Sequence, residues 1–160
     1  MAFYEQTGVL VFGSRLRRLS ESFLADVNRI YKFHGIPFDA SWFPIFYLLS
    51  GEESLSIRDL SEALETSHSA ASQLVSKLQE KGLLKTVADK SDARRKKVAF
   101  TAKGQKLLKQ VKPIWKAVQA AMDELLQESP ENRQFMAAIW STEQSLAQQS
   151  VFNRIEKHLP

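Results

Sequence analysis

The stretch SIRDLSEALETSHSAASQLVSKLQEKG, residues 56–82, predicts two short helices separated by a tight break at residues 65–67. Ser56 and Asp59 have the spacing of a capping box, in which each side chain binds the backbone N–H of the other residue. The apolar face of this first helix is expected to contain Ile57, Leu60 and Leu64. Two helices with so short a connection form a helix-turn-helix.

The second helix of the pair is expected to begin at Ser67, whose hydroxyl can cap it. It should end before Gly82, a residue suited to a left-handed backbone. Its buried face is expected to contain Ala71, Leu74, Val75 and Leu78. The opposite face is polar, so this helix presents hydrogen-bonding side chains outside the fold.

Two short strands follow the helix-turn-helix. The segments LLKTVAD (83–89) and RKKVAFT (95–101) each have the pattern of a strand, and the polar residues between them suit a turn. A hairpin directly after a helix-turn-helix is the wing of a winged helix. Thr101 is then placed to cap the next helix, predicted over 102–128.

Further helices flank this central part. Apolar residues recur at helical spacing over 9–34, and FDASWFPIFYLLSG (38–51) predicts a second helix capped by Asp39 or Ser41. Ser129 and Pro130 start a last helix that is expected to reach about Lys157. The predicted fold class is therefore mainly α (α+β), a winged helix-turn-helix with a two-stranded wing between N- and C-terminal helices.

Composition excludes several classes of protein. Of the 160 residues, 44% are hydrophobic, which is enough for a core, and the absence of cysteine excludes disulfides and thiolate metal sites. The longest apolar run, WFPIFYLL (42–49), is far shorter than the roughly 20 residues of a membrane span. The first residues show no signal-peptide pattern. We therefore expect a soluble, cytoplasmic protein with no membrane partner.

Positive charge is concentrated in the middle of the chain. Between Lys77 and Lys112 there are twelve lysines and arginines and three acidic residues, a net charge of +9, whereas the remaining residues carry −5. A run of charge is by itself more often a solvated face. Because this one coincides with a helix-turn-helix, it favours a polyanion as partner, and double-stranded DNA in particular.

The stretch IRDLSEALETSHSAASQLVSKLQEKGLLKTVADKSDARRKKVAFTAKG (57–104) resembles the MarR family of winged-helix transcriptional regulators. Its most specific part is the wing signature, which reads here Asp92-x-Arg94-x-x-x-Val98-x-Phe100-Thr101. Phe100 stands where the family usually has leucine, a change that keeps an inward-facing apolar residue in the strand.

The resemblance implies a domain layout and a mode of action. It implies one MarR-type domain over 1–160, with a DNA-binding lobe at 40–101 and helical dimerisation regions at 1–36 and 102–160. It further implies a homodimer on a near-palindromic operator, and often control by a small molecule. We therefore expect a sequence-specific transcription regulator, and a repressor rather than an activator.

The second helix of the pair is expected to enter the major groove of DNA as the recognition helix. Its outward-facing residues are His68, Ser69, Ser72, Gln73, Ser76 and Lys77. Gln73 can pair bidentately with adenine, whereas the absence of arginine removes the commonest contact with guanine. Alternatively, His68 adds to the N-terminal cap, and Ser69 and Ser72 are plain helix surface.

The wing is expected to follow the DNA backbone. Arg94 near its tip suits a narrow minor groove, and Asp92 would hold the guanidinium in place. The other wing cations, Lys90, Arg95, Lys96 and Lys97, are expected to contact phosphates.

Two further groups of apolar residues suggest binding surfaces. In the family, effectors lodge between the dimer helices and the DNA-binding lobe, and a small aromatic or lipophilic effector is expected near Trp42, Phe43, Phe46, Tyr47 and Trp115. Aromatic residues at helical spacing are, however, more often core. A two-fold dimer interface is expected from Phe12, Leu16, Leu19, Ile139, Leu146, Phe152 and Ile155.

Other functions compete with a specific regulator. A nonspecific or architectural DNA-binding protein would use the same charge, and a winged helix can also serve protein contacts. The three histidines are far apart and unpaired at helical spacing, so no metal is expected. The sequence contains no phosphate-binding loop and no catalytic set of residues, so neither a cofactor nor an enzyme is expected.

Overall fold

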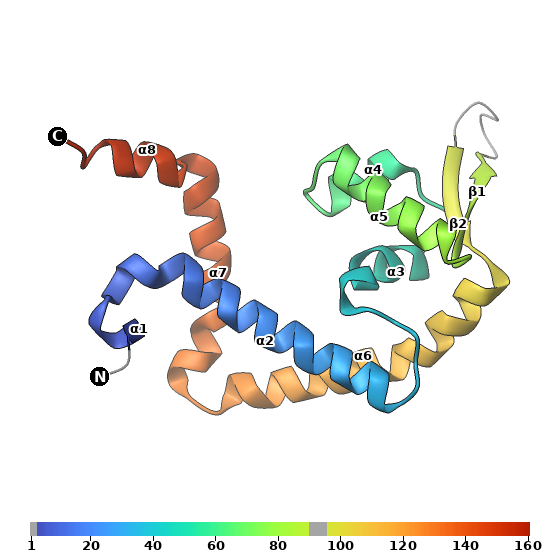
Figure 1. Ribbon diagram of the computed structural model, residues 1–160, viewed down its shortest axis with the longest axis horizontal. Coiled ribbons are helices and arrows are strands. Elements are labelled where there is room, and N and C mark those ends of the chain that lie inside the picture. The colour runs from blue at the N-terminus through green and yellow to red at the C-terminus, as the bar shows by residue number, and fades with distance from the viewer. Residues whose placement is uncertain (1–2, 90–95) are drawn as a thin grey trace. The chain divides into compact units, whose positions relative to one another are not determined.

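The computed structural model describes residues 3–89 and 96–160 (Figure 1). Its elements, in chain order, are α1 (Phe3–Gln6), η1 (Gly8–Val11), α2 (Phe12–Phe33), η2 (Ala40–Trp42), α3 (Phe43–Ser50), α4 (Ile57–Ala63), α5 (His68–Glu80), β1 (Leu84–Ala88), β2 (Lys96–Phe100), α6 (Ala102–Gln127), α7 (Pro130–Gln148) and α8 (Val151–Glu156). The chain forms two compact units, Met1–Trp115 and Lys116–Pro160, which divide inside α6.

One hydrophobic core holds the first unit together. It takes side chains from α2, α3, α4, α5, both strands and the first half of α6, and it includes Tyr31, Phe38, Trp42, Ile45, Phe46, Leu49, Leu60, Val75, Leu78, Leu83, Leu84, Val98, Phe100, Leu107, Leu108 and Val111. The rings of Phe46 and Phe100 lie 4.9 Å apart, so the second strand packs directly on α3. Phe100 therefore does face inward, as the sequence predicts.

The helix-turn-helix, α4 and α5, has the predicted caps. Ser56 Oγ accepts from the backbone N–H of Asp59, and the Asp59 carboxylate accepts from the N–H of Ser56. The Ser67 hydroxyl caps α5 by accepting from the N–H of Ala70. Between the helices Glu65 has φ +48°, a left-handed conformation that is unusual for a residue with a side chain. The turn therefore stores some backbone strain that the packing around it must offset.

The wing begins directly after α5. Gly82 has φ +69°, and the N–H of Leu83 donates to the carbonyl of Leu78 at 2.9 Å, which ends the helix as predicted. The strands pair antiparallel, with Leu84 opposite Phe100. Leu55, before α4, forms an isolated bridge with Val98 through two hydrogen bonds of 2.7 and 3.0 Å. This bridge, which the sequence reasoning missed, ties the start of the helix-turn-helix to the second strand.

Two of the predicted helices have different limits. The helix expected over 9–34 begins at Phe12, because Gly8, with φ +55°, and the residues after it form a 3-10 turn. The helix expected over 129–157 starts as predicted, with the Ser129 hydroxyl accepting from the N–H of Asn132. It is interrupted at Gln149, whose backbone is extended, and Ser150 caps the separate helix α8. The serine that begins a new helix here was not recognised as a cap.

The second unit differs from the first in having almost no buried side chains. Neither α7 nor α8 contains a buried residue, although both contain aromatic and aliphatic side chains. Helices of this length derive most of their stability from packing an apolar face, so α7 and α8 need a partner surface. Among the described residues, no helix combines the length and the apolar character that crossing a membrane requires.

The first turn of α6 lies very close to the backbone of Leu83, which follows α5. A Cβ atom added to Gly104 would lie 2.1 Å from the carbonyl oxygen of Leu83 and 2.9 Å from the Phe100 ring. Real Cβ contacts do not reach such distances, so only glycine allows the first turn of α6 to rest on the backbone at Leu83.

We expect Gly104→Ala to lower the free energy of unfolding by about 2–3 kcal/mol, because the backbone at Leu83 must move to admit the methyl group. The matched control is Gly51→Ala, where the added Cβ meets only one atom, at 3.9 Å, and the change should stay within about 0.5 kcal/mol. Urea unfolding followed by circular dichroism measures both. Equal stabilities of the two variants would show that the close approach at Gly104 is not a constraint.

Candidate nucleic-acid interface

The outward face of α5 is polar, as the sequence predicts. His68, Ser69, Gln73, Ser76 and Lys77 are exposed and Ser72 is half-buried. Ala71, Val75 and Leu78 are buried on the other side. The structure therefore brings all six predicted recognition-helix residues to the part of the helix that the core leaves open.

Lys77 occupies the edge of this polar face. Its charge, with that of Lys81, contributes to holding the pKa of Asp39 below its ordinary value, after the larger effect of the hydrogen bonds from Ser41. Asp39 lies in the connection between α2 and α3. The ammonium of Lys77 therefore lies on the side of α5 that is close to the α2–α3 connection. This position suits contact with a phosphate better than contact with a base.

The recognition helix is fixed at its far end by a side-chain contact with the wing. Gln79 Nε2 donates to Thr86 Oγ1 at 2.9 Å, joining the last turn of α5 to the first strand. Together with the buried side of the helix, this contact limits rotation of α5 about its own axis. The polar face is thus presented in one orientation relative to the strands.

The root of the wing contains an ion pair. Lys97 Nζ lies 3.0 Å from Asp89 Oδ2, and the carboxylate side chain is 9% exposed. Lys96, in contrast, is exposed. Lys97 therefore neutralises a shielded carboxylate and helps to close the hairpin, while Lys96 is the strand lysine available to a phosphate. The predicted wing residues Lys90, Asp92, Arg94 and Arg95 lie outside the described residues.

A polar depression of about 890 Å³ lies between the starts of α4 and α5 and the root of the wing. Its walls include Ser56, Ile57, Arg58, Asp59, Glu62, His68, Asp89, Lys96 and Lys97. His68 thus lines the same depression as charged side chains of α4 and of the wing root. The recognition helix and the wing root are parts of one continuous polar surface.

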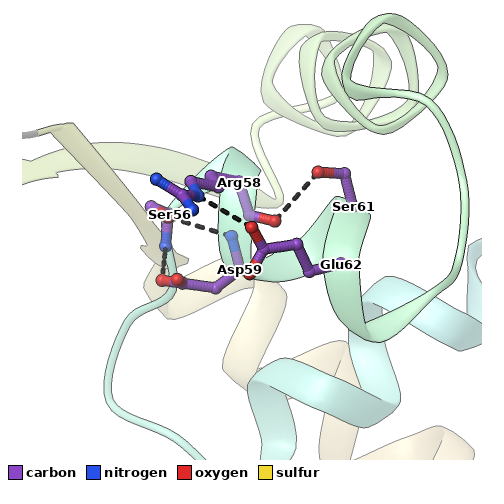
Figure 2. A network of polar contacts seen from close by, with 5 residues as sticks. All are labelled: Ser56, Arg58, Asp59, Ser61 and Glu62. Carbon is purple, nitrogen blue, oxygen red and sulfur yellow. Dashed lines mark hydrogen bonds and ion pairs between the residues drawn. The ribbon is translucent and has the colours of Figure 1, made fainter.

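Figure 2 shows the hydrogen-bonded network that builds the α4 side of this surface. Arg58 Nε donates to Glu62 Oε1 at 2.7 Å, one helical turn away, and the Ser61 hydroxyl donates to the carbonyl of Arg58. The pKa of Asp59 is held below its ordinary value by hydrogen bonds from Ser56 and, to a smaller extent, by the charges of Lys97 and Arg58. Asp59 therefore stays ionised at neutral pH and keeps α4 capped.

The five aromatic residues proposed for an effector are divided between two places. Trp42 and Phe46 are buried in the core, whereas Phe43 and Tyr47 are exposed. The ring of the half-buried Trp115 lies 5.0 Å from that of Phe43 and 5.9 Å from that of Tyr47, and its Nε1 donates to the hydroxyl of Tyr31. Trp42 lines a separate pocket that none of the other four residues reaches.

Comparison with known proteins identifies this arrangement. A sequence model of the MarR family matches residues 34–95, the segment that holds α3, the helix-turn-helix and the first strand. Over this segment the chain is similar to the MarR family. Among curated proteins none matches the chain. The family includes transcriptional regulators, in agreement with the function that the resemblance in the sequence implies.

Solved structures confirm the predicted fold. S. aureus MepR in complex with DNA has a TM-score of 0.70 at 23% identity, over 84% of this chain and 97% of that one. The M. tuberculosis transcriptional regulator MOSR in complex with DNA has a TM-score of 0.63 at 20% identity, over 82% and 95% of the two chains. CouR from Rhodococcus jostii RHA1, bound to p-coumaroyl-CoA, has a TM-score of 0.60 at 25% identity, over 87% and 93%. The mainly α winged helix is therefore the fold of this chain.

The titration of Asp59 provides a test of the α4 cap. Its lowered pKa means that the ionised carboxylate stabilises the folded chain above the ordinary aspartate pKa of about 3.9, and that this stabilisation is lost as the pH falls toward the lower folded value. We expect Asp59→Asn to lower the free energy of unfolding by about 0.5–1 kcal/mol at pH 7. The difference in the free energy of unfolding between this variant and the unsubstituted chain should shrink as the pH falls from 5 to 3, an interval that brackets the ordinary aspartate pKa of about 3.9.

Ser56→Ala is the companion variant for this measurement, made by denaturant unfolding at several pH values. It removes the hydroxyl that accepts from Asp59 N–H and should cost about 1 kcal/mol. It leaves the carboxylate and the backbone N–H of Ser56 in place, so its stability should keep more of the acid dependence than that of Asp59→Asn. An unchanged acid dependence in Asp59→Asn would contradict the assigned role.

Proposed function

We propose that the chain is a homodimeric repressor that binds a near-palindromic operator and is released from it by a small molecule. The observation that carries the DNA-binding part is the polar outer face of α5 beside the exposed Lys96 at the root of the wing. A helix of this diameter fits the major groove, and a cation at the wing root then meets the adjacent phosphates. MepR and MOSR, which have similar folds, are each in complex with DNA in their structures, and this supports DNA as the partner.

The recognition helix would read bases mainly through Gln73. Its exposed amide can accept from and donate to one adenine edge, while Ser69 and Ser76 on the same face can bond a base or a phosphate. Because α5 contains no arginine, the bidentate guanine contact is missing from this helix. Sequence discrimination should then depend also on the shape of the minor groove, where the sequence places Arg94.

Dimerisation is proposed from apolar surface that the chain leaves uncovered. One stripe of α2 begins with the exposed Phe12, Leu16 and Leu19 and continues to the buried Tyr31. In the second unit Leu146, Phe152 and Ile155 are exposed and Ile139 is half-buried. Surfaces of this kind are rare on monomers, and a second copy supplies identical apolar stripes. The assignment of 1–36 and 102–160 to dimerisation stays a prediction.

The effector part of the proposal is supported by CouR, which is bound to p-coumaroyl-CoA in its structure. In this chain the exposed Phe43 and Tyr47 and the half-buried Trp115 form a group of rings against which a flat apolar molecule can pack. The identity of the effector, the repressor role and the cytoplasmic location remain predictions.

A nonspecific DNA-binding function is the second candidate. The observation that favours it is the absence of arginine from α5, since a protein that binds DNA without sequence preference needs phosphate contacts and no base contacts. The two functions differ in their preference for one sequence. A specific regulator should bind its operator about 10³-fold or more tightly than random duplex at the same salt concentration.

Selection of bound duplexes from a random pool tests the main proposal. We expect a sequence with two related half-sites about 34 Å, or one helical turn, apart. On that operator, Gln73→Ala should lose about 1–3 kcal/mol of binding free energy, because the base contact is removed, and Arg94→Ala should also weaken operator binding. Fluorescence anisotropy with the operator and with scrambled duplex measures both.

Lys96→Ala is the matched variant for the phosphate contact. It should weaken binding to operator and scrambled duplex alike, and it should reduce the slope of log affinity against log salt by about 1. If Gln73→Ala also lost the same binding free energy on the operator and on the scrambled duplex, a base contact by Gln73 would be contradicted. Binding that is insensitive to salt would contradict the whole interface.

The dimer interface is tested by an aspartate placed on the α2 stripe. Leu16 and Ala25 are both exposed, and nine residues of an α-helix correspond to 2.5 turns, so they lie on opposite sides of α2. We expect Leu16→Asp to dissociate the dimer at micromolar concentration and Ala25→Asp to leave it intact. Sedimentation equilibrium measures the mass of each, and a monomeric unsubstituted chain would remove the proposal.

A further inference from the structure

The polar depression between α4, α5 and the root of the wing contains as many acidic as cationic side chains among the described residues that line it. Its charged lining residues are Arg58, Lys96, Lys97, Asp59, Glu62 and Asp89. The formal charges of these six residues cancel, although His68 and the exposed Lys96 of the same lining belong to the surface proposed to meet DNA. A phosphate backbone at this surface would therefore meet carboxylates as well as cations.

Two of the three carboxylates have a role in the fold. Asp59 accepts from the backbone N–H of Ser56 and so caps α4. Asp89 is 9% exposed and lies 3.0 Å from Lys97 Nζ, at the root of the hairpin. Glu62 differs from both, because its side chain is 63% exposed and accepts from a partner that is equally open to solvent.

That partner is Arg58, one helical turn away on α4. Arg58 Nε donates to Glu62 Oε1 at 2.7 Å, and the Arg58 side chain is 80% exposed (Figure 2). An exposed ion pair of this kind contributes little to stability, because water screens it. A phosphate is a competing acceptor, since it binds a guanidinium in a bidentate manner and releases counterions on contact. The guanidinium can therefore exchange the carboxylate for a phosphate at small cost to the fold.

We propose that Glu62 competes with DNA phosphates for the Arg58 guanidinium, and so keeps the affinity of the chain for any duplex below the value that its cations alone would give. This inference rests on the proposed function, because it requires DNA at the surface formed by α5 and the root of the wing. When DNA binds, Arg58 exchanges Glu62 for a phosphate, and the carboxylate is left beside the DNA as a like charge. Phosphate contacts carry no sequence information, so the effect is the same for every base sequence.

Another ion pair of the chain provides a matched control. Arg17 Nε lies 2.7 Å from Glu21 Oε1 on α2, and the two side chains are 80% and 62% exposed. This pair has the same spacing, distance and exposure as the pair of Arg58 and Glu62, but Glu21 does not line the depression. Changing either glutamate to glutamine alters the net charge of the chain by the same amount. Glu21→Gln therefore controls for the general effect of charge on DNA binding.

The test uses the full chain and a labelled duplex of scrambled sequence, so it requires no operator. We expect Glu62→Gln to bind this duplex about threefold more tightly than the unsubstituted chain, and to steepen the slope of log affinity against log salt, because the guanidinium then meets a phosphate with its full charge. Glu21→Gln should leave affinity and slope unchanged. Fluorescence anisotropy at several salt concentrations measures both quantities. The proposal is overturned if Glu62→Gln binds like Glu21→Gln, or more weakly than the unsubstituted chain.

Arg58→Gln separates competition for the guanidinium from plain repulsion between Glu62 and DNA. Alone it should weaken binding by about threefold, because a phosphate contact is lost. Adding Glu62→Gln to Arg58→Gln should recover only a small part of the gain that Glu62→Gln gives by itself, because the two residues act as one unit. An undiminished gain in the double variant would show that Glu62 only repels DNA, and would refute the competition.

Lys96→Ala, measured in the same series, distinguishes failure of this inference from failure of the proposed function. If Lys96→Ala weakens binding while the two glutamate variants agree, the competition is refuted and the proposed DNA interface stands. If the unsubstituted chain binds no duplex at all, both proposals are refuted.

Discussion

The junction at Thr101 is the constraint on which the winged helix depends. Its hydroxyl donates to the carbonyl of Gly82 at 2.7 Å and accepts from the N–H of Gly104 at 3.0 Å, while its own N–H donates to the carbonyl of Leu83. Through these hydrogen bonds Thr101 joins three places: the residues just after α5, the end of the second strand and the start of α6. The contact requires the backbones to approach so closely that Gly104 has no room for a side chain.

The polar surface proposed for DNA follows from this junction. Because Thr101 bonds the chain just after α5, it connects the second strand, which begins at the exposed Lys96, to the end of the helix that carries the polar face. The Asp89–Lys97 ion pair and the Leu55–Val98 bridge add to the same rigidity from the other side of the hairpin. Side chains placed on such a scaffold lose little further freedom when they meet a partner, which favours binding.

The two units of the chain differ in how their helices are stabilised. The first buries a continuous core, so its helices are held by their own tertiary contacts. The second has helices α7 and α8 with no buried residue and with Trp140 and Phe152 exposed. Propensity alone stabilises helices of this length only marginally in water. The proposed homodimer resolves this, because a two-fold partner covers the apolar faces that one chain leaves open.

The sequence by itself determined most of the elements and their caps, but not the 3-10 turn after Gly8 or the cap of α8 at Ser150. Ser56, Asp59, Ser67, Gly82 and Ser129 act within a few residues of their own position, so local spacing is enough to predict them. The alternation of Val98 and Phe100 likewise gives their inward orientation, because strand side chains alternate between the two faces.

Only the tertiary structure decided which distant residues meet. The pairing of Leu55 with Val98, the ion pair between Asp89 and Lys97, and the pocket that joins Trp42 to the lysines of α6 all depend on how separate elements pack. The sequence grouped Trp42 with Tyr47 and Trp115, whereas the fold buries Trp42 beside Phe38 and leaves Tyr47 exposed. Periodicity specifies the face of one helix, but the partner of that face is set by the long-range contacts of the whole fold.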